Sequence, residues 1–153
     1  MRTRSLALGL ALIAIVLVAV TNVSAQNAGS SRFGVWNNQS NPNNVMTYES
    51  YGDGGMKITV TNTRNGNTSS WGYVTMFDGE FRAVEGQEGS ETAVEVINER
   101  STRIINKRNG RVSQIIINTL SAAGSTINNE YIRMDADGKI IGVGHVVYER
   151  SAR

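Results

Sequence analysis

The sequence predicts an all-β fold, a single up-and-down antiparallel β-barrel of about eight to ten strands. Three observations lead to this prediction. Apolar and polar residues alternate along most of the chain, as they do in strands that bury one face. Asn-Gly or Asp-Gly pairs, which favour tight hairpin turns, interrupt the alternation at residues 65–66, 78–79, 109–110 and 137–138. Helical spacing is nearly absent, so a series of hairpins is the simplest arrangement.

Two runs show the alternation most clearly. Segment 56–63 alternates between apolar residues and Lys, Thr or Asn, and segment 69–77 places four side chains on one face, namely Trp71, Tyr73, Thr75 and Phe77. Extending the same criteria along the chain gives the full set of expected strands. These strands are 45–51, 56–63, 69–77, 80–85, 91–97, 101–107, 111–119, 126–134 and 140–149.

Residues 1–25 have the pattern of a secretory signal peptide. Arg2 and Arg4 precede an apolar run over 6–20, and small residues stand at the cleavage positions before Gln26. We expect cleavage after Ala25 and a periplasmic or secreted protein. The alternative is an uncleaved anchor, because the apolar run approaches the length of a short transmembrane span. No later apolar run is long enough to cross a bilayer.

The remaining chain has the size of one domain. We expect residues 26–32 to be a flexible tail, because the segment that begins there is rich in Asn, Ser and Gln, and residues 33–150 to form the barrel. About 128 residues suffice for one core and are too few for two ordinary domains. The chain has no cysteine, which excludes disulfides, thiol nucleophiles and thiolate metal sites.

The charge balance argues against a nucleic-acid partner. The chain has 15 basic and 13 acidic residues, and two of the basic residues lie in the expected leader. The mature protein would therefore be neutral, without the basic surface of a nucleic-acid binder. An acidic block over 78–99 precedes a basic block over 100–111. These blocks form either a charged patch for an unknown protein partner or, as we expect, solvated pairs between adjacent strands.

A family resemblance rests on a few residues. Gly34-Val35-Trp36 at the barrel entry and Arg150 after the last strand resemble the lipocalin pattern, which implies an indole across the closed end with a guanidinium stacked on it. The spacing of the Tyr48 to Gly54, Trp71 to Glu80 and Val147 to Arg150 segments is similar to that of small secreted bacterial proteins with lipocalin-like, calycin-type domains. This resemblance covers most of residues 33–150 and supplies no catalytic motif.

Three aromatic residues are candidates for a ligand cavity. Trp71, Tyr73 and Phe77 could line it, since ligand pockets are mainly hydrophobic and aromatic. Core packing explains them equally well, because a small barrel can fill its own interior with side chains.

Tyr131 and Arg133 are candidates for holding a ligand's carboxylate. They lie two residues apart on one expected strand, and an Arg beside a Tyr hydroxyl can bind a carboxylate, as in the similar pair of intracellular fatty-acid-binding barrels. The alternative is that this face is solvated and that the opposite face, with Ile132 and Met134, points inward.

Catalytic and metal sites are not indicated. His145, the only histidine, lies in an apolar strand without a recognisable partner, so we expect a structural role. Residues 135–138 resemble the start of a calcium loop, but Val146 stands where its final glutamate would be, so a hairpin turn is the better interpretation. We therefore expect no catalytic residue, no cofactor and no metal.

The function that the sequence favours is a secreted, non-enzymatic barrel that binds a small apolar or amphipathic molecule. The alternative is a filled barrel that acts through its outer surface, as an envelope-associated interaction protein or an inhibitor. An isomerase or cyclase would need an acid–base pair facing a cavity. A cavity above roughly 300 Å³ would favour ligand binding, whereas a solid core with an apolar outer patch would favour the surface role.

Overall fold

The computed structural model describes residues 29–152, so the expected leader over residues 1–25 lies outside the described residues. Ten antiparallel strands form one sheet, in the order β4-β3-β2-β1-β10-β9-β8-β7-β6-β5. The strands are β1 (Gly34–Asn38), β2 (Asn44–Tyr51), β3 (Gly55–Arg64), β4 (Asn67–Thr75), β5 (Arg82–Ala83), β6 (Ser90–Asn98), β7 (Ser101–Arg108), β8 (Arg111–Leu120), β9 (Thr126–Met134) and β10 (Ile140–Arg150). No helix within residues 29–152 is long and apolar enough to cross a membrane.

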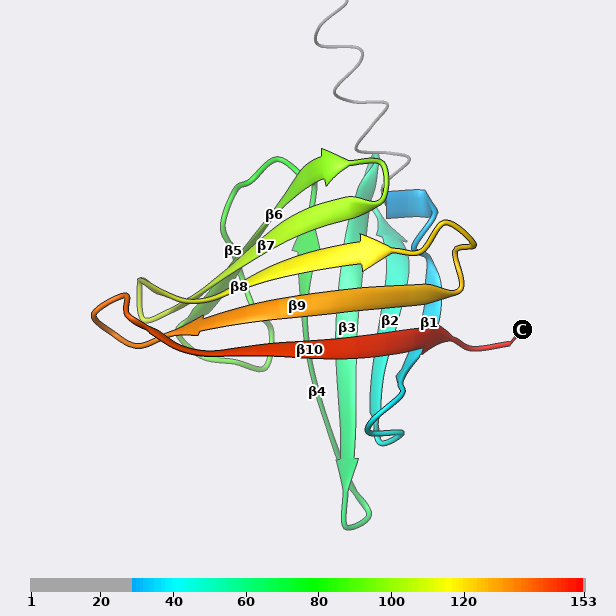
Figure 1. Ribbon diagram of the computed structural model, residues 1–153, viewed down its shortest axis with the longest axis horizontal. Coiled ribbons are helices and arrows are strands. Elements are labelled where there is room, and N and C mark those ends of the chain that lie inside the picture. The colour runs from blue at the N-terminus through cyan, green and yellow to red at the C-terminus, as the bar shows by residue number, and fades with distance from the viewer. Residues whose placement is uncertain (1–28, 153) are drawn as a thin grey trace, which may run out of the picture.

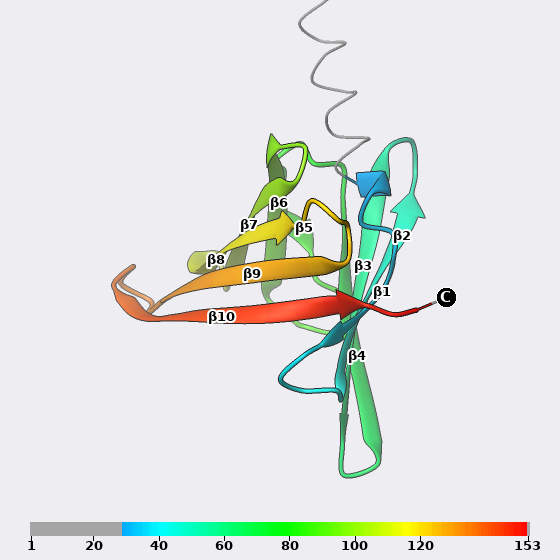
Figure 2. The ribbon, with the colours of Figure 1, turned by 45° about the vertical axis from the view of Figure 1, so that its right-hand side comes forward.

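The sheet curls into a nearly closed barrel. Its strand order follows the chain around the cylinder, because β1 pairs with both β2 and β10. The two ends of the sheet meet where Gly72 N–H donates to Glu85 O at 3.1 Å and Glu85 N–H donates to Gly72 O at 2.8 Å. Strands β8, β9 and β10 run across the direction of β1 to β4, so the two halves enclose one interior (Figures 1 and 2). The predicted single antiparallel up-and-down barrel is confirmed.

One strand was missed and one is shorter than predicted. The expected strands between residues 45 and 149 are present with small shifts at their ends, except that the predicted strand 80–85 is reduced to β5, residues 82–83. Strand β1 lies in a segment where no strand was predicted. Its pairing joins Trp36 to Arg150. Because the partner strand lies so far along the chain, the local alternation of residues does not indicate this strand.

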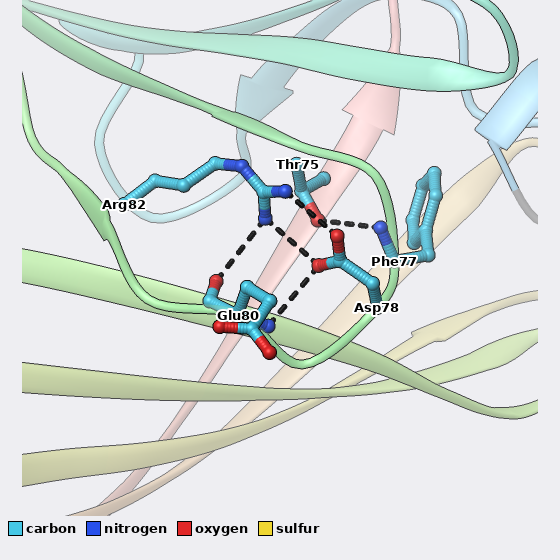
Figure 3. A network of polar contacts seen from close by, with 5 residues as sticks. All are labelled: Thr75, Phe77, Asp78, Glu80 and Arg82. Carbon is cyan, nitrogen blue, oxygen red and sulfur yellow. Dashed lines mark hydrogen bonds and ion pairs between the residues drawn. The ribbon is translucent and has the colours of Figure 1, made fainter.

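The connection between β4 and β5 explains why β5 is short. Asp78 binds Arg82 through both carboxylate oxygens, at 2.8 and 2.7 Å, and accepts a bond from Glu80 N–H at 3.1 Å (Figure 3). Phe77 has a φ of 59°, and its N–H donates to Thr75 Oγ1 at 2.8 Å. These contacts bend the chain out of strand geometry. The hydrogen bond to Arg82 lowers the pKa of Asp78 to about 2.

Only two of the four expected hairpin turns have both central residues at positive φ. Asn65-Gly66 and Asn109-Gly110 do, as a type I′ turn requires. At residues 78–79 and 137–138 the glycine alone of each pair has positive φ, so neither is a type I′ turn, although the 137–138 pair lies in the predicted hairpin between β9 and β10. At both sites an aspartate carboxylate accepts backbone N–H bonds, and this side-chain turn replaces the type I′ geometry.

Opposite charges meet across β6 and β7. Glu95 and Arg103 are register partners and form an exposed ion pair. The acidic and basic blocks of the sequence thus lie on adjacent strands, where such a pair contributes little to stability.

One end of the barrel is closed by Trp36. This side chain is 0% exposed, and its Nε1–H donates to Arg32 O at 2.9 Å. The Arg150 guanidinium lies 4.2 Å from the indole centroid and donates to three backbone carbonyls, those of Phe33, Ser31 and Gly124. Gly34 has a φ of 136°, and a Cβ there would lie 3.0 Å from Arg150 Nη1. The Gly-x-Trp segment and Arg150 therefore form one packed unit.

The expected flexible tail over 26–32 does not extend to Arg32. This residue is 1% exposed; its Nε donates to Asn118 Oδ1 at 3.1 Å and its Nη2 to Arg100 O at 2.6 Å. Burial lowers the pKa of Arg32. Arg32, the last residue of the expected tail, is instead buried at the closed end of the barrel. Its guanidinium can be buried there because Asn118 and the Arg100 carbonyl accept hydrogen bonds from it.

Replacing Gly72 by Ala is expected to lower the free energy of unfolding by about 1–3 kcal/mol, because the added methyl group overpacks the sheet. A Cβ at Gly72 would lie 2.6 Å from Ile58 O. Urea unfolding followed by circular dichroism measures this. The matched control is Gly144→Ala, whose Cβ would meet only Tyr131 Cδ2 at 4.0 Å. Equal stability losses in the two variants would contradict this account of the seam.

Candidate functional site at the open end of the barrel

The barrel encloses a cavity of about 170 Å³. Most of its lining is apolar or aromatic and the rest is polar, because inward positions of neighbouring strands carry different residue types. The apolar and aromatic members are Met46, Tyr48, Ile58, Val60, Trp71, Tyr73, Ile104, Ile116, Tyr131 and Tyr148. The amide members are Asn44, Asn62, Asn106, Gln114 and Asn129. Such a lining suits a molecule with both apolar and hydrogen-bonding parts.

A second pocket, of about 330 Å³, forms the mouth of the barrel at the end away from Trp36. Trp71, Asn106 and Gln114 line both this pocket and the cavity, so the two adjoin at these side chains. We call the two together the mouth and cavity. The mouth carries three cationic side chains and one carboxylate, namely Lys107, Arg108, Arg133 and Glu91.

Trp71 and Tyr73 lie where a ligand would meet them. Their rings are stacked, with centroids 6.4 Å apart and planes 16° apart, and both line the cavity. Phe77, the third expected aromatic, does not line it. Strand β4 ends at Thr75, and the positive φ of Phe77 takes this side chain out of the inward series. It packs instead beside Gly29, buried at 7% exposure.

Tyr131 and Arg133 share the inward face of β9 but lie at different depths. Tyr131 lines the cavity, whereas Arg133 lines the mouth. The structure pairs Tyr131 with Asn129 through a 3.3 Å hydrogen bond and gives no bond between Tyr131 and Arg133. Ile132, on the rival face, is 36% exposed on the outside of the barrel. Tyr131 and Arg133 therefore lie at successive depths from the cavity to the mouth and do not surround one common binding point.

A chain of buried hydrogen bonds runs from the closed end into the cavity. Arg32 donates to Asn118 Oδ1, and Asn118 Nδ2 donates to Asn129 Oδ1 at 2.8 Å and to the Tyr48 hydroxyl at 3.4 Å. Asn129 in turn donates to the Tyr131 hydroxyl. Buried polar groups need such partners, and here each link orients the next. The chain fixes the Tyr131 hydroxyl in the cavity wall.

Two shorter amide clusters line the other walls. Tyr148 OH donates to Asn44 Oδ1 at 2.7 Å, and Asn44 Nδ2 donates to Asn62 Oδ1 at 2.7 Å. Asn106 Nδ2 donates to Gln114 Oε1 at 2.9 Å. Sequence reasoning missed these amides. The signal that could have found them is Asn or Gln at inward positions of regular strands, where asparagine is otherwise uncommon.

The described residues that line the cavity carry ionisable groups of one kind. Its ionisable side chains are four tyrosines, and burial raises the pKa of Tyr48, Tyr73, Tyr131 and Tyr148. Among the described residues that line the cavity there is no carboxylate and no histidine. These hydroxyls and amides can orient a ligand by neutral hydrogen bonds.

His145 lies outside the barrel. It is exposed on β10, and its Nε2 is 3.3 Å from Asn128 Oδ1 on the neighbouring strand. Within residues 29–152 no three His, Cys, Asp or Glu side chains gather as metal ligands would. The expected structural role of His145 stays a prediction.

An apolar groove of about 490 Å³ runs over the outer face of β8, β9 and β10. Register places Ile115 opposite Ile132 and Ile132 opposite Val143, so these side chains form a row. Val143 is 73% exposed. Exposed apolar rows of this kind are found at protein interaction surfaces.

Comparisons with known proteins add little. No model of a known protein family matches the chain, and no curated protein matches it. One similar solved structure is described as a redesigned beta barrel, with 12% sequence identity and a TM-score of 0.43, over 82% of this chain and 96% of that chain.

Alkaline pH is expected to unfold the protein as its buried tyrosines ionise. Their folded pKa values are raised, so their contribution to stability is complete below the unfolded value of about 10 and is lost as pH rises above it. Absorbance at the tyrosinate band and circular dichroism, recorded together against pH, test this. Ionisation of every tyrosine near pH 10 with the β-sheet signal intact would contradict it.

Proposed function

We propose that this protein is a secreted, non-enzymatic β-barrel that binds a small amphipathic molecule in the mouth and cavity. The observation that supports this most is that a concave mouth adjoins a partly polar interior, with Trp71 lining both. The stacked Trp71 and Tyr73 rings offer an apolar surface, and the inward amides offer hydrogen bonds. Sites for small organic molecules commonly combine these two features.

The volumes limit the size of the ligand. A cavity of about 170 Å³ is close to the roughly 150 Å³ of an apolar cavity that accepts benzene. The inner part of the ligand would therefore be a single ring or a short branched chain. The cavity alone falls below the roughly 300 Å³ of usual ligand sites, and the mouth supplies the remaining space.

The closed end supports a lipocalin-like interpretation. Gly34, Trp36 and Arg150 seal the end opposite the mouth, so a ligand would enter where Arg133 lies. Export to the periplasm or the medium after cleavage at Ala25 is part of the proposal and rests on the leader sequence. Binding rather than catalysis is favoured by the neutral interior, whose tyrosine pKa values are raised by burial.

The outer groove favours a second candidate function. Ile115, Ile132 and Val143 present an apolar row to solvent, as expected of a barrel that acts through its surface on another protein. This candidate requires no ligand in the interior.

Adjacent residues of β8 separate the two candidates. Ile116 is buried in the cavity wall, whereas Ile115 lines the outer groove. Ile116→Phe should fill the cavity and weaken binding of the neutral amphipath phenylbutanol by at least about tenfold, and Ile115→Phe should change it by less than about twofold. Isothermal titration calorimetry measures both affinities, and circular dichroism checks that both variants are folded.

A second cavity-filling variant, Ile104→Phe, guards against a local rearrangement at Ile116, because Ile104 lines the same cavity from β7. Loss of binding in Ile115→Phe alone would move the site to the outer groove. Absence of binding of both phenylbutanol and its carboxylate analogue phenylbutyrate to the unaltered protein would contradict the proposed function.

A further inference from the structure

The mouth has an excess of positive charge without ion-pair partners among the described residues. Lys107 and Arg108 reach it from the end of β7 and Arg133 from β9, and Glu91 is the one carboxylate among its lining residues. The two ion pairs in the part of the chain that the structure describes, Asp78–Arg82 and Glu95–Arg103, involve none of these four side chains.

Local contacts hold these cations without neutralising them. Arg108 Nη1 donates to Ser90 Oγ at 3.2 Å, and Lys107 Nζ lies 3.4 Å from the Phe81 ring centroid. A Cβ at Gly142 would lie 3.5 Å from Arg133 Nη2, so the Arg133 side chain crosses the β10 backbone at a position without a side chain. The Ser90 hydroxyl, the Phe81 ring and Gly142 carry no negative charge, so these contacts do not neutralise the three cations.

Like charges gathered at a concave site favour an anion there. Field lines concentrate in a cleft, so the mouth attracts anions even when the whole protein carries little net charge. Hydrogen bonds from Arg to carboxylate or phosphate oxygens are also stronger than neutral ones. Behind the charges, Trp71 lines both the mouth and the cavity of about 170 Å³, whose volume suits a single apolar ring.

We infer that the ligand is a single-ring organic anion whose acidic group binds Arg133 and Arg108 at the mouth while its ring enters the cavity past Trp71. This inference rests on the proposed function and adds the charge and orientation of the ligand. The acidic group is a carboxylate, sulfonate or phosphate, because each offers the oxygens that guanidinium groups bind. Tyr131, deeper in the cavity, meets the ring end of the ligand rather than its acidic group.

Three probes with one skeleton test the inference. Phenylbutyrate, phenylbutanol and phenylbutylamine share a ring and chain and differ in charge. Calorimetry with the complete protein should show phenylbutyrate binding at least about tenfold more tightly than phenylbutanol, with phenylbutylamine weakest. Added salt should weaken the binding of phenylbutyrate and leave that of phenylbutanol nearly constant.

Charge-neutral variants locate the acidic group. Arg133→Gln and Arg108→Gln should each reduce the ratio of phenylbutyrate to phenylbutanol affinity by about threefold to tenfold. The matched control is Lys57→Gln, which removes one positive charge from an exposed, outward position of β3. This control should leave the ratio unchanged.

The outcomes separate the inference from the proposed function. Equal binding of the three probes, or preference for the amine, would overturn the inference and leave the proposed function standing. An anion preference that Lys57→Gln reduces as much as Arg133→Gln would also overturn it. Binding of none of the probes would overturn both.

Discussion

The contact between Arg150 and Trp36 is the constraint on which the rest of the structure depends. Arg150 ends the last strand and Trp36 lies in the first, so their 4.2 Å contact joins the two ends of the barrel chain. The same guanidinium binds the carbonyls of Ser31 and Phe33, which fixes the segment that carries Arg32. Because the Trp36 side chain fills this end, the candidate site lies at the opposite end, where Arg133 lines the mouth.

The interior is kept partly polar by amides that satisfy one another. An isolated buried amide is costly, but Asn118 and Asn129 form a connected chain with Arg32 and two tyrosines. The chain spans from the closed end to the cavity, so the polarity of the cavity wall is tied to the seal at Trp36. A wall of this kind leaves specific hydrogen-bonding atoms at the edge of an otherwise apolar space.

Local pattern predicted most strands but not how the barrel closes. Alternation located β3 and β8, and the Asn109-Gly110 pair located the hairpin between β7 and β8, because both signals arise from neighbouring residues. Strand β1 and the burial of Arg32 depend on partners far along the chain. No short window of sequence contains those partners.

The residues that line the cavity were predicted in part for the same reason. Trp71, Tyr73 and Tyr131 were found because their strand positions share the inward face. Phe77 was misplaced because its strand ends two residues earlier than the alternation suggests. The basic mouth could not be predicted, since Arg108 and Arg133 come together only when β7 and β9 curl around β8.

Mapping of backbone amide chemical shifts by NMR during titration with phenylbutanol tests most directly whether the open end is the binding site. The account predicts shifts at the backbone amides of Trp71, Asn106 and Gln114, which line the mouth and cavity, and none at that of Trp36, whose side chain is buried at the opposite end. Shifts confined to Ile132 and Val143 on the outer face would contradict it.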